Sequence, residues 1–137
     1  MNTQLGGLTP AAMRYMLDVT FRGKAPADRL FMGLSRRPPP GAAVDLAELT
    51  RLEPRGAAGY KRASILAGAW RESGELAIET PSLTFENTGA QPWPTMEVGF
   101  VTTSEDGAGE LLAWTWLRSP RLLLSGDRLV IPARLGF

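Results

Sequence analysis

The side chains that could carry chemistry in this 137-residue chain are few, because the sequence has neither histidine nor cysteine. Imidazole and thiol groups serve most hydrolases as bases, nucleophiles or metal ligands, so Ser-His-Asp and Cys-His catalysis and zinc sites of these ligands are excluded. A pair of carboxylates of the glycosidase kind remains possible. Its candidate members are Glu79, Glu86, Glu97 and Asp106. Nothing in the sequence brings two of them together, so we expect no catalytic residue, and a carbohydrate-active β-sandwich enzyme is the alternative.

The acidic turn Glu105-Asp106-Gly107 has residue types that also occur in calcium loops. A calcium ion takes about six to eight oxygen ligands, and a calcium loop supplies most of them at defined spacing, which this segment does not. A hairpin turn accounts for all three residues. We therefore expect no metal and no cofactor.

A Gly-x-x-Gly motif, Gly56 to Gly59, lies between basic residues in the segment 55–62. Such a motif can clamp a nucleic-acid backbone in one RNA-binding fold, but that fold places helices beside it. Here the motif leads into a β-like stretch, and the net charge of the chain is only +1. A chain without excess positive charge has no general attraction for nucleic acid or for an anionic membrane surface, so we expect neither partner.

Arginine and tryptophan are the residues that could anchor a protein partner. Of the 15 basic residues 13 are arginine, an excess that a coding bias toward GC-rich codons would also produce. Trp114 and Trp116 lie two apart on a predicted strand and so share one face, which is either core or an exposed anchor. The candidate interface residues are Asn2, Thr3, Gln4, Leu5, Arg36, Arg37, Trp93, Trp114 and Trp116.

The elements that must position these residues begin with residues 1–8, which are polar, glycine-containing and without periodicity. They predict a flexible arm, of a kind that can order against a neighbouring subunit. Thr9-Pro10 is typical of a helix start, with threonine as the N-cap and proline in the first turn. Apolar residues at spacings of three and four then predict one amphipathic helix over about 9–22, with its methionines in the core.

Short apolar runs separated by turn signals fill the rest of the chain. They are 30–35, 60–66, 76–80, 82–85, 96–103, 110–117, 122–124 and 128–131. The clearest hairpin joins 96–103 to 110–117, whereas 44–52 reads as a helix or a loop. Residues 9–137 are therefore predicted to be a single β-rich domain, an antiparallel β-sandwich or jelly-roll-like fold with one N-terminal amphipathic helix.

The compartment is also indicated by what the sequence lacks. No apolar stretch approaches the ~20 residues of a spanning helix, and the start of the chain has no basic segment followed by an apolar run, as a signal peptide would. Without cysteine, no disulfide framework can supply stability. We expect a soluble protein of the cytosol, or of a particle assembled there.

Several short motifs follow one another in an order that resembles a known family. They are Phe31-Met32-Gly33-Leu34-Ser35, Gly59-Tyr60-Lys61-Arg62, Val98-Gly99-Phe100, Gly109-Glu110-Leu111-Leu112-Ala113-Trp114 and Ser125-Gly126-Asp127. Over most of the chain, this order is similar to that of small tailed-bacteriophage virion proteins, described as capsid-decoration or tail-fibre-like proteins. The proline-rich segment 36–40 and the Pro92-x-Pro94 pair depart from the family pattern.

The resemblance implies a β-rich virion structural protein that forms a homo-oligomer, often a trimer, and has no catalytic residues. The function that follows is that of a capsid decoration (cement) protein, which binds the major capsid protein and stabilises the head. Such a protein would lie on the capsid surface of the virion after assembly in the host cytoplasm. A tail or head fibre module that contacts a host surface is the alternative within virions.

Overall fold

The computed structural model of the chain describes the backbone of residues 4–136 and the side chains of residues 7–136. Its elements follow in the order β1 (Gln4–Leu8), α1 (Pro10–Phe21), β2 (Arg29–Ser35), α2 (Leu46–Leu52), β3 (Ala63–Leu66), the 3-10 turn η1 (Ala67–Ala69), β4 (Arg71–Glu72), β5 (Ala77–Glu79), β6 (Leu83–Glu86), β7 (Met96–Thr102), β8 (Leu111–Arg121), β9 (Arg128–Ile131) and β10 (Ala133–Gly136). The mainly β fold predicted from the sequence is confirmed, but with two α-helices in place of one.

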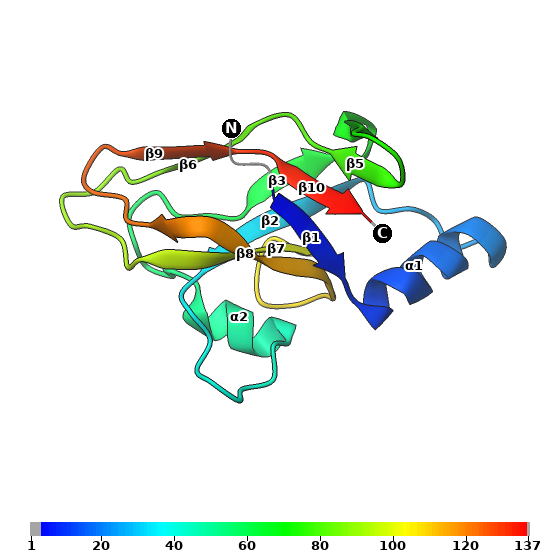
Figure 1. The fold of residues 1–137 in the computed structure, drawn as a ribbon, viewed down its shortest axis with the longest axis horizontal. Helices are drawn as coiled ribbons and strands as arrows, with labels where there is room; N and C mark the ends of the chain where they lie inside the picture. Colours follow the sequence, from blue (N-terminus) through cyan, green and yellow to red (C-terminus); the bar gives the residue numbers. More distant parts are fainter. Residues whose placement is uncertain (1–3, 137) are drawn as a thin grey trace.

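Eight of these strands form one sheet in the order β3-β2-β7-β8-β1-β10-β5-β4, and β6 and β9 form a separate two-stranded ribbon. Neighbouring strands are antiparallel except for β1 and β10, which run parallel. The predicted hairpin of 96–103 with 110–117 is confirmed as β7 and β8, where Phe100 pairs with Trp114 and Val101 with Ala113. It forms the middle of the sheet (Figure 1).

The eight-stranded sheet is strongly curled, because its two edge strands, β3 and β4, are close in sequence. Leu66 ends β3 and Arg71 begins β4, with only η1 and Trp70 between them. Five residues of chain span at most about 18 Å, whereas eight strands laid flat would separate the two edges by roughly 34 Å. The sheet must therefore bend until its edges can be bridged by this short connection.

Apolar clusters lie on both faces of the sheet. The larger one joins β2, β7 and β10 to Phe85 of β6 and Leu129 of β9, so the ribbon covers one face. The smaller one holds Leu49 of α2 against Val98 and Phe100 of β7. Since consecutive strand residues point to opposite faces, β7 is buried on both sides, which explains why its sequence is a nearly continuous apolar run.

The helix predicted over about 9–22 corresponds to α1, and its start has the predicted cap. The Thr9 hydroxyl oxygen accepts a hydrogen bond from the amide of Ala12 at 3.1 Å and donates to the Leu111 carbonyl at 2.6 Å, so the cap also ties the helix to β8. The prediction that the methionines of this helix are core residues is wrong. Met13 and Met16 are exposed, and Ala12 is the only fully buried residue of α1.

The prediction of a flexible arm over 1–8 is wrong for residues 4–8. They form β1, which lies inside the sheet between β8 and β10 (Figure 1). The reason is pairing with strands more than a hundred residues away: Gly7 pairs with Trp114, and a Cβ at Gly7 would contact the Trp114 carbonyl. A deletion of residues 1–8 would therefore remove a central strand of the sheet. Residues 1–3 lie outside the described part.

At Gly59, the segment that leads to β3 passes close to the end of β6. Its φ is +85°, and the amide of Thr88 donates to the Ala58 carbonyl beside it at 3.2 Å. A Cβ at Gly59 would overlap the carbonyl oxygen of Glu86. Gly56 also has a left-handed backbone, with φ +83°, but a Cβ there would have nothing within 4 Å.

This pair of glycines gives a matched test of the close approach. We expect Gly56→Ala to lower the free energy of unfolding by about 1 kcal/mol, because only the left-handed backbone is strained. Gly59→Ala should cost roughly 1–3 kcal/mol more, because overlap is added to the same strain. Urea unfolding at equilibrium measures both; equal losses would contradict the close contact.

Candidate functional site

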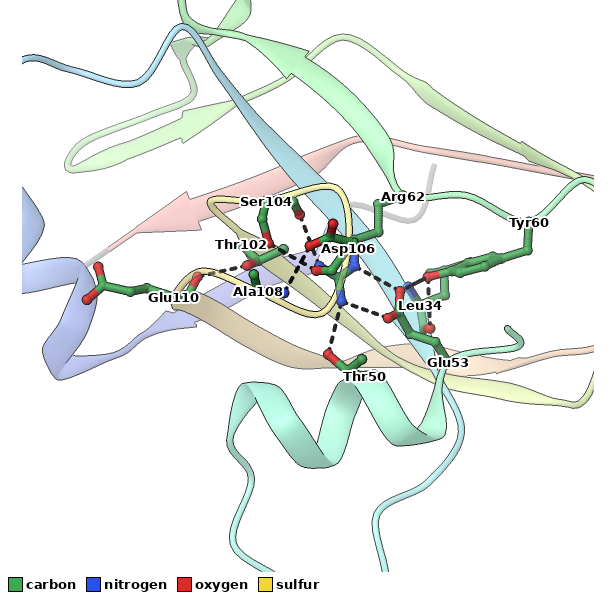
Figure 2. A network of polar contacts seen from close by, with 10 residues as sticks. All are labelled: Leu34, Thr50, Glu53, Tyr60, Arg62, Thr102, Ser104, Asp106, Ala108 and Glu110. Atoms are coloured by element: carbon green, nitrogen blue, oxygen red, sulfur yellow. Dashed lines mark hydrogen bonds and ion pairs between the residues drawn. The ribbon is translucent and has the colours of Figure 1, made fainter. Parts of the chain in front are cut away.

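The motif that resembles a nucleic-acid clamp leads to a buried ion pair. Arg62 and Glu53 are both within the protein interior, and Nη2 of the arginine lies 2.7 Å from Oε1 of the glutamate. Glu53 follows α2, Arg62 precedes β3, and the loop between β7 and β8 closes over the guanidinium (Figure 2). Three segments of the chain therefore meet at one charged group.

All five N–H groups of the Arg62 guanidinium have an acceptor. They donate to both carboxylate oxygens of Glu53, to the Thr50 hydroxyl and to the carbonyls of Ser104 and Asp106. The ring of Phe100 packs against the guanidinium, with 5.2 Å between the guanidinium carbon and the ring centroid. With every donor used inside the protein, Arg62 holds the fold together and presents nothing to a phosphate.

Tyr60 completes this network on the side of β2. Its hydroxyl contacts Oε2 of Glu53 and accepts from the amide of Leu34 at 3.1 Å. Burial raises the pKa of Tyr60 well above the usual value of a tyrosine, and the nearby carboxylate of Glu53 raises it further. The hydroxyl therefore stays protonated throughout the neutral range.

The candidate carboxylates lie on four different elements, and several have local partners. Glu86 on β6 pairs with Arg128, and Glu97 on β7 pairs with Arg37. Asp106 lies in the β7–β8 turn, where its carboxylate accepts from the amide of Ala108 at 3.0 Å, as expected for a turn residue. Within residues 4–136, no group of three or more acidic side chains is placed to hold a metal ion.

Three of the candidate interface residues come together on the surface of β8. The rings of Trp114 and Trp116 meet edge to face with 5.9 Å between their centroids. The guanidinium carbon of Arg37 lies 5.2 Å from the centre of the Trp116 ring, and its Nε lies 3.3 Å from the Glu97 carboxylate. Trp116 is 44% exposed, whereas Trp114 is half-buried against the cluster under α2. We call Arg37, Glu97, Trp114 and Trp116 the tryptophan surface.

The sequence could not show that these residues meet. Arg37 follows β2, and Glu97 is on β7; their distance is set by the antiparallel pairing of Ser35 with Val98. Val98 in turn pairs with Trp116. Register across three strands therefore places the arginine over the indole. Glu97 was not among the expected interface residues, and no local signal in the sequence indicates its part.

Two other candidates have structural roles. Trp93 is buried in the main core, and its indole N–H donates to the Ala58 carbonyl at 3.1 Å, so the expectation that it lies at an interface is wrong. Arg36 is exposed, but its guanidinium donates to the carbonyls of Arg51 and Leu52 at 3.3 Å and so caps the end of α2.

The remaining candidates were expected in an N-terminal arm. Asn2 and Thr3 lie outside the described residues, and Gln4 and Leu5 form the start of β1, where only the backbone is described. In this strand, Gln4 pairs with Ala133 and Leu5 with Arg134 of β10. Gln4 and Leu5 are therefore strand residues paired with β10 and do not belong to a free arm.

Comparison with known proteins leaves the family open. No protein-family model matches the chain, and a search of curated proteins gives no significant match. Among the helices of residues 4–136, none is long and apolar enough to cross a membrane.

The buried pair makes a clear prediction for stability. Arg62→Met should lower the free energy of unfolding by about 3–5 kcal/mol, because the carboxylate of Glu53 is left buried without its partner. Changing both residues, Arg62→Met with Glu53→Leu, should recover part of that loss, because no charge then remains buried. Arg128→Met, at the exposed pair with Glu86, is the control and should change little. Equal effects at the two arginines would contradict the role of the buried pair.

Tyr60 makes a prediction for alkaline pH. Its pKa is raised in the folded state, so the folded protein keeps a proton that the unfolded chain loses above about pH 10. The contribution is therefore complete below pH 10 and is lost as the pH rises further, by up to about 1.4 kcal/mol per pH unit. We expect the stability advantage of the native protein over Tyr60→Phe to shrink between about pH 10 and pH 11. An advantage independent of pH, in urea unfolding, would contradict this.

Proposed function

We propose that this chain is a bacteriophage virion structural protein, a capsid decoration protein that binds the major capsid protein through the tryptophan surface. The observation that carries the proposal is the convergence of three residues expected at an interface: Arg37 lies over the exposed ring of Trp116, and half-buried Trp114 packs edge to face against it. Tryptophan and arginine are the residue types that most often dominate binding energy at protein interfaces.

The motif order that resembles the phage family supports the proposal, because its residues occupy positions that build the scaffold. Gly59 is required by a close backbone approach, and Tyr60 and Arg62 belong to the buried network. In the final motif, Gly126 has φ +82°, and Asp127 accepts from the amide of Leu124 at 2.9 Å. Residues in such positions maintain the fold, which in this proposal is a β-sandwich or jelly-roll-like arrangement. The residues of the binding surface can then differ between proteins that share the motifs.

The tryptophan surface has features suited to docking on a large assembly. Arg37 lies over the indole of Trp116 and pairs with Glu97, contacts that favour this position of the guanidinium before a partner arrives. Pre-ordering reduces the entropy lost on binding. On a capsid, many such contacts act together, and binding to the assembled state alone stabilises it by mass action. A homo-oligomer, such as the expected trimer, would add avidity.

The test is attachment to purified phage capsids that lack the protein. We expect Trp116→Ala and Arg37→Ala each to weaken attachment at least tenfold, the loss expected of an interface hot spot. Val130→Ala is the matched control, since Val130 is a comparably exposed apolar residue on the β6–β9 ribbon. Equilibrium sedimentation with labelled protein gives the bound fraction.

Two outcomes would overturn the proposal. One is that the native protein fails to attach to capsids of any phage whose genome encodes it. The other is that Trp116→Ala and Val130→Ala attach equally well, which would remove the tryptophan surface from the interface. Circular dichroism and urea unfolding of each variant establish that a loss of attachment is not a loss of folding.

A further inference from the structure

The apolar stripe of α1 is turned away from the rest of the protein. Ala12, Tyr15 and Val19 are the buried or half-buried side of the helix. The large apolar residues at helical spacing, Leu17 and Phe21 with the two methionines, are exposed, Phe21 by 78%. Figure 1 shows α1 extending outward from the sheet. An amphipathic helix normally buries its apolar side, so here a surface ready for contact is open.

A groove of about 540 Å³ lies directly beside this stripe. Leu8 and Leu135 line it from β1 and β10, Met16 lines it from α1, and Leu76 and Ile78 line it from the β4–β5 hairpin. The same chain thus carries protruding apolar side chains and, next to them, an apolar groove.

Leu76 adds a sign of strain at the edge of the groove. Among residues 4–136, it is the one residue other than glycine with a positive φ, at 55°. A leucine pays for this conformation, whereas glycine or asparagine would not. Its side chain is nonetheless 72% exposed. A strained backbone that holds a large apolar side chain in solvent indicates that this side chain contacts another molecule.

Charges on the two parts of this surface are opposite. The helix and its extension, 10–24, contain Arg14, Arg22 and Lys24 against Asp18, a net charge of +2. The hairpin segment 71–79 contains three glutamates against Arg71, a net charge of −2. A helix from a second copy would therefore meet a groove of complementary charge.

We propose that this surface binds a second copy of the same chain, with the α1 stripe of one copy lying in the groove between α1 and the β4–β5 hairpin of the other. The exposed apolar residues of the α1 stripe and the groove offer on the order of 700 Å² per copy, so two copies would bury at most about 1,400 Å², within the range of specific protein interfaces. Each copy contributes both helix and groove, as a closed homo-oligomer requires. This inference does not depend on the capsid proposal.

The test is the molar mass of the purified protein, by light scattering after size-exclusion chromatography over a wide range of concentration. The native protein should have the mass of an oligomer. Leu17→Glu should shift it to monomer and weaken association at least tenfold, because a carboxylate would enter an apolar contact. Val130→Glu introduces the same charge at a residue of similar exposure on β9 and should leave the mass unchanged.

Charge reversal examines the direction of docking. Glu75→Arg and Arg22→Glu should each weaken association, and their combination should restore part of it, because the opposite charges then face each other again. A native protein that is monomeric at every concentration would overturn the inference, as would equal masses of Leu17→Glu and Val130→Glu. Trp116→Ala should still form the oligomer. A loss of capsid attachment in this variant is therefore distinguishable from a loss of self-association.

Discussion

The fold depends on one buried cation that must be fully hydrogen-bonded. A guanidinium removed from water is tolerated only when its charge is paired and its donors have acceptors. Arg62 satisfies this requirement only if Glu53 after α2, Thr50 within α2 and the β7–β8 loop are all in place. Through Tyr60, the same network reaches the backbone of β2. The helix α2, which shares no strand ladder with the sheet, is thereby fixed over the face of β7.

The buried network of Arg62, Glu53 and Tyr60 lies inside the protein, so these groups are not available to a ligand. The surface is left for contacts with other proteins. A buried arginine, a buried carboxylate and the tyrosine that contacts it join segments of the chain. Two groups are notable on the surface: Trp116 of β8 with the guanidinium of Arg37 over its ring, and the apolar stripe of α1 beside the groove lined by Leu76. A protein with these two surfaces is suited to a place between partners, and the proposals assign one surface to a capsid and the other to a second copy.

Local patterns were reliable where the signal lies in neighbouring residues. Thr9-Pro10 marked the start of α1, and the turn between 96–103 and 110–117 marked the central hairpin. The same patterns failed where a distant strand decides. Gly6 and Gly7 weaken any strand signal, yet β1 forms because β8 and β10 offer their edges. Periodicity also identified the apolar stripe of α1 but not which side of the helix meets the protein.

The sequence by itself therefore determined the class of structure and the kinds of side chain that can act: a mainly β chain with turns at set places, without imidazole or thiol groups. Only the tertiary structure decided which residues meet. Strand register brought Arg37 over Trp116, and the closure of α2 and the β7–β8 loop buried Arg62. The physical reason is that burial and strand pairing are non-local. The free energy of each contact depends on partners tens of residues away, which no local spacing encodes.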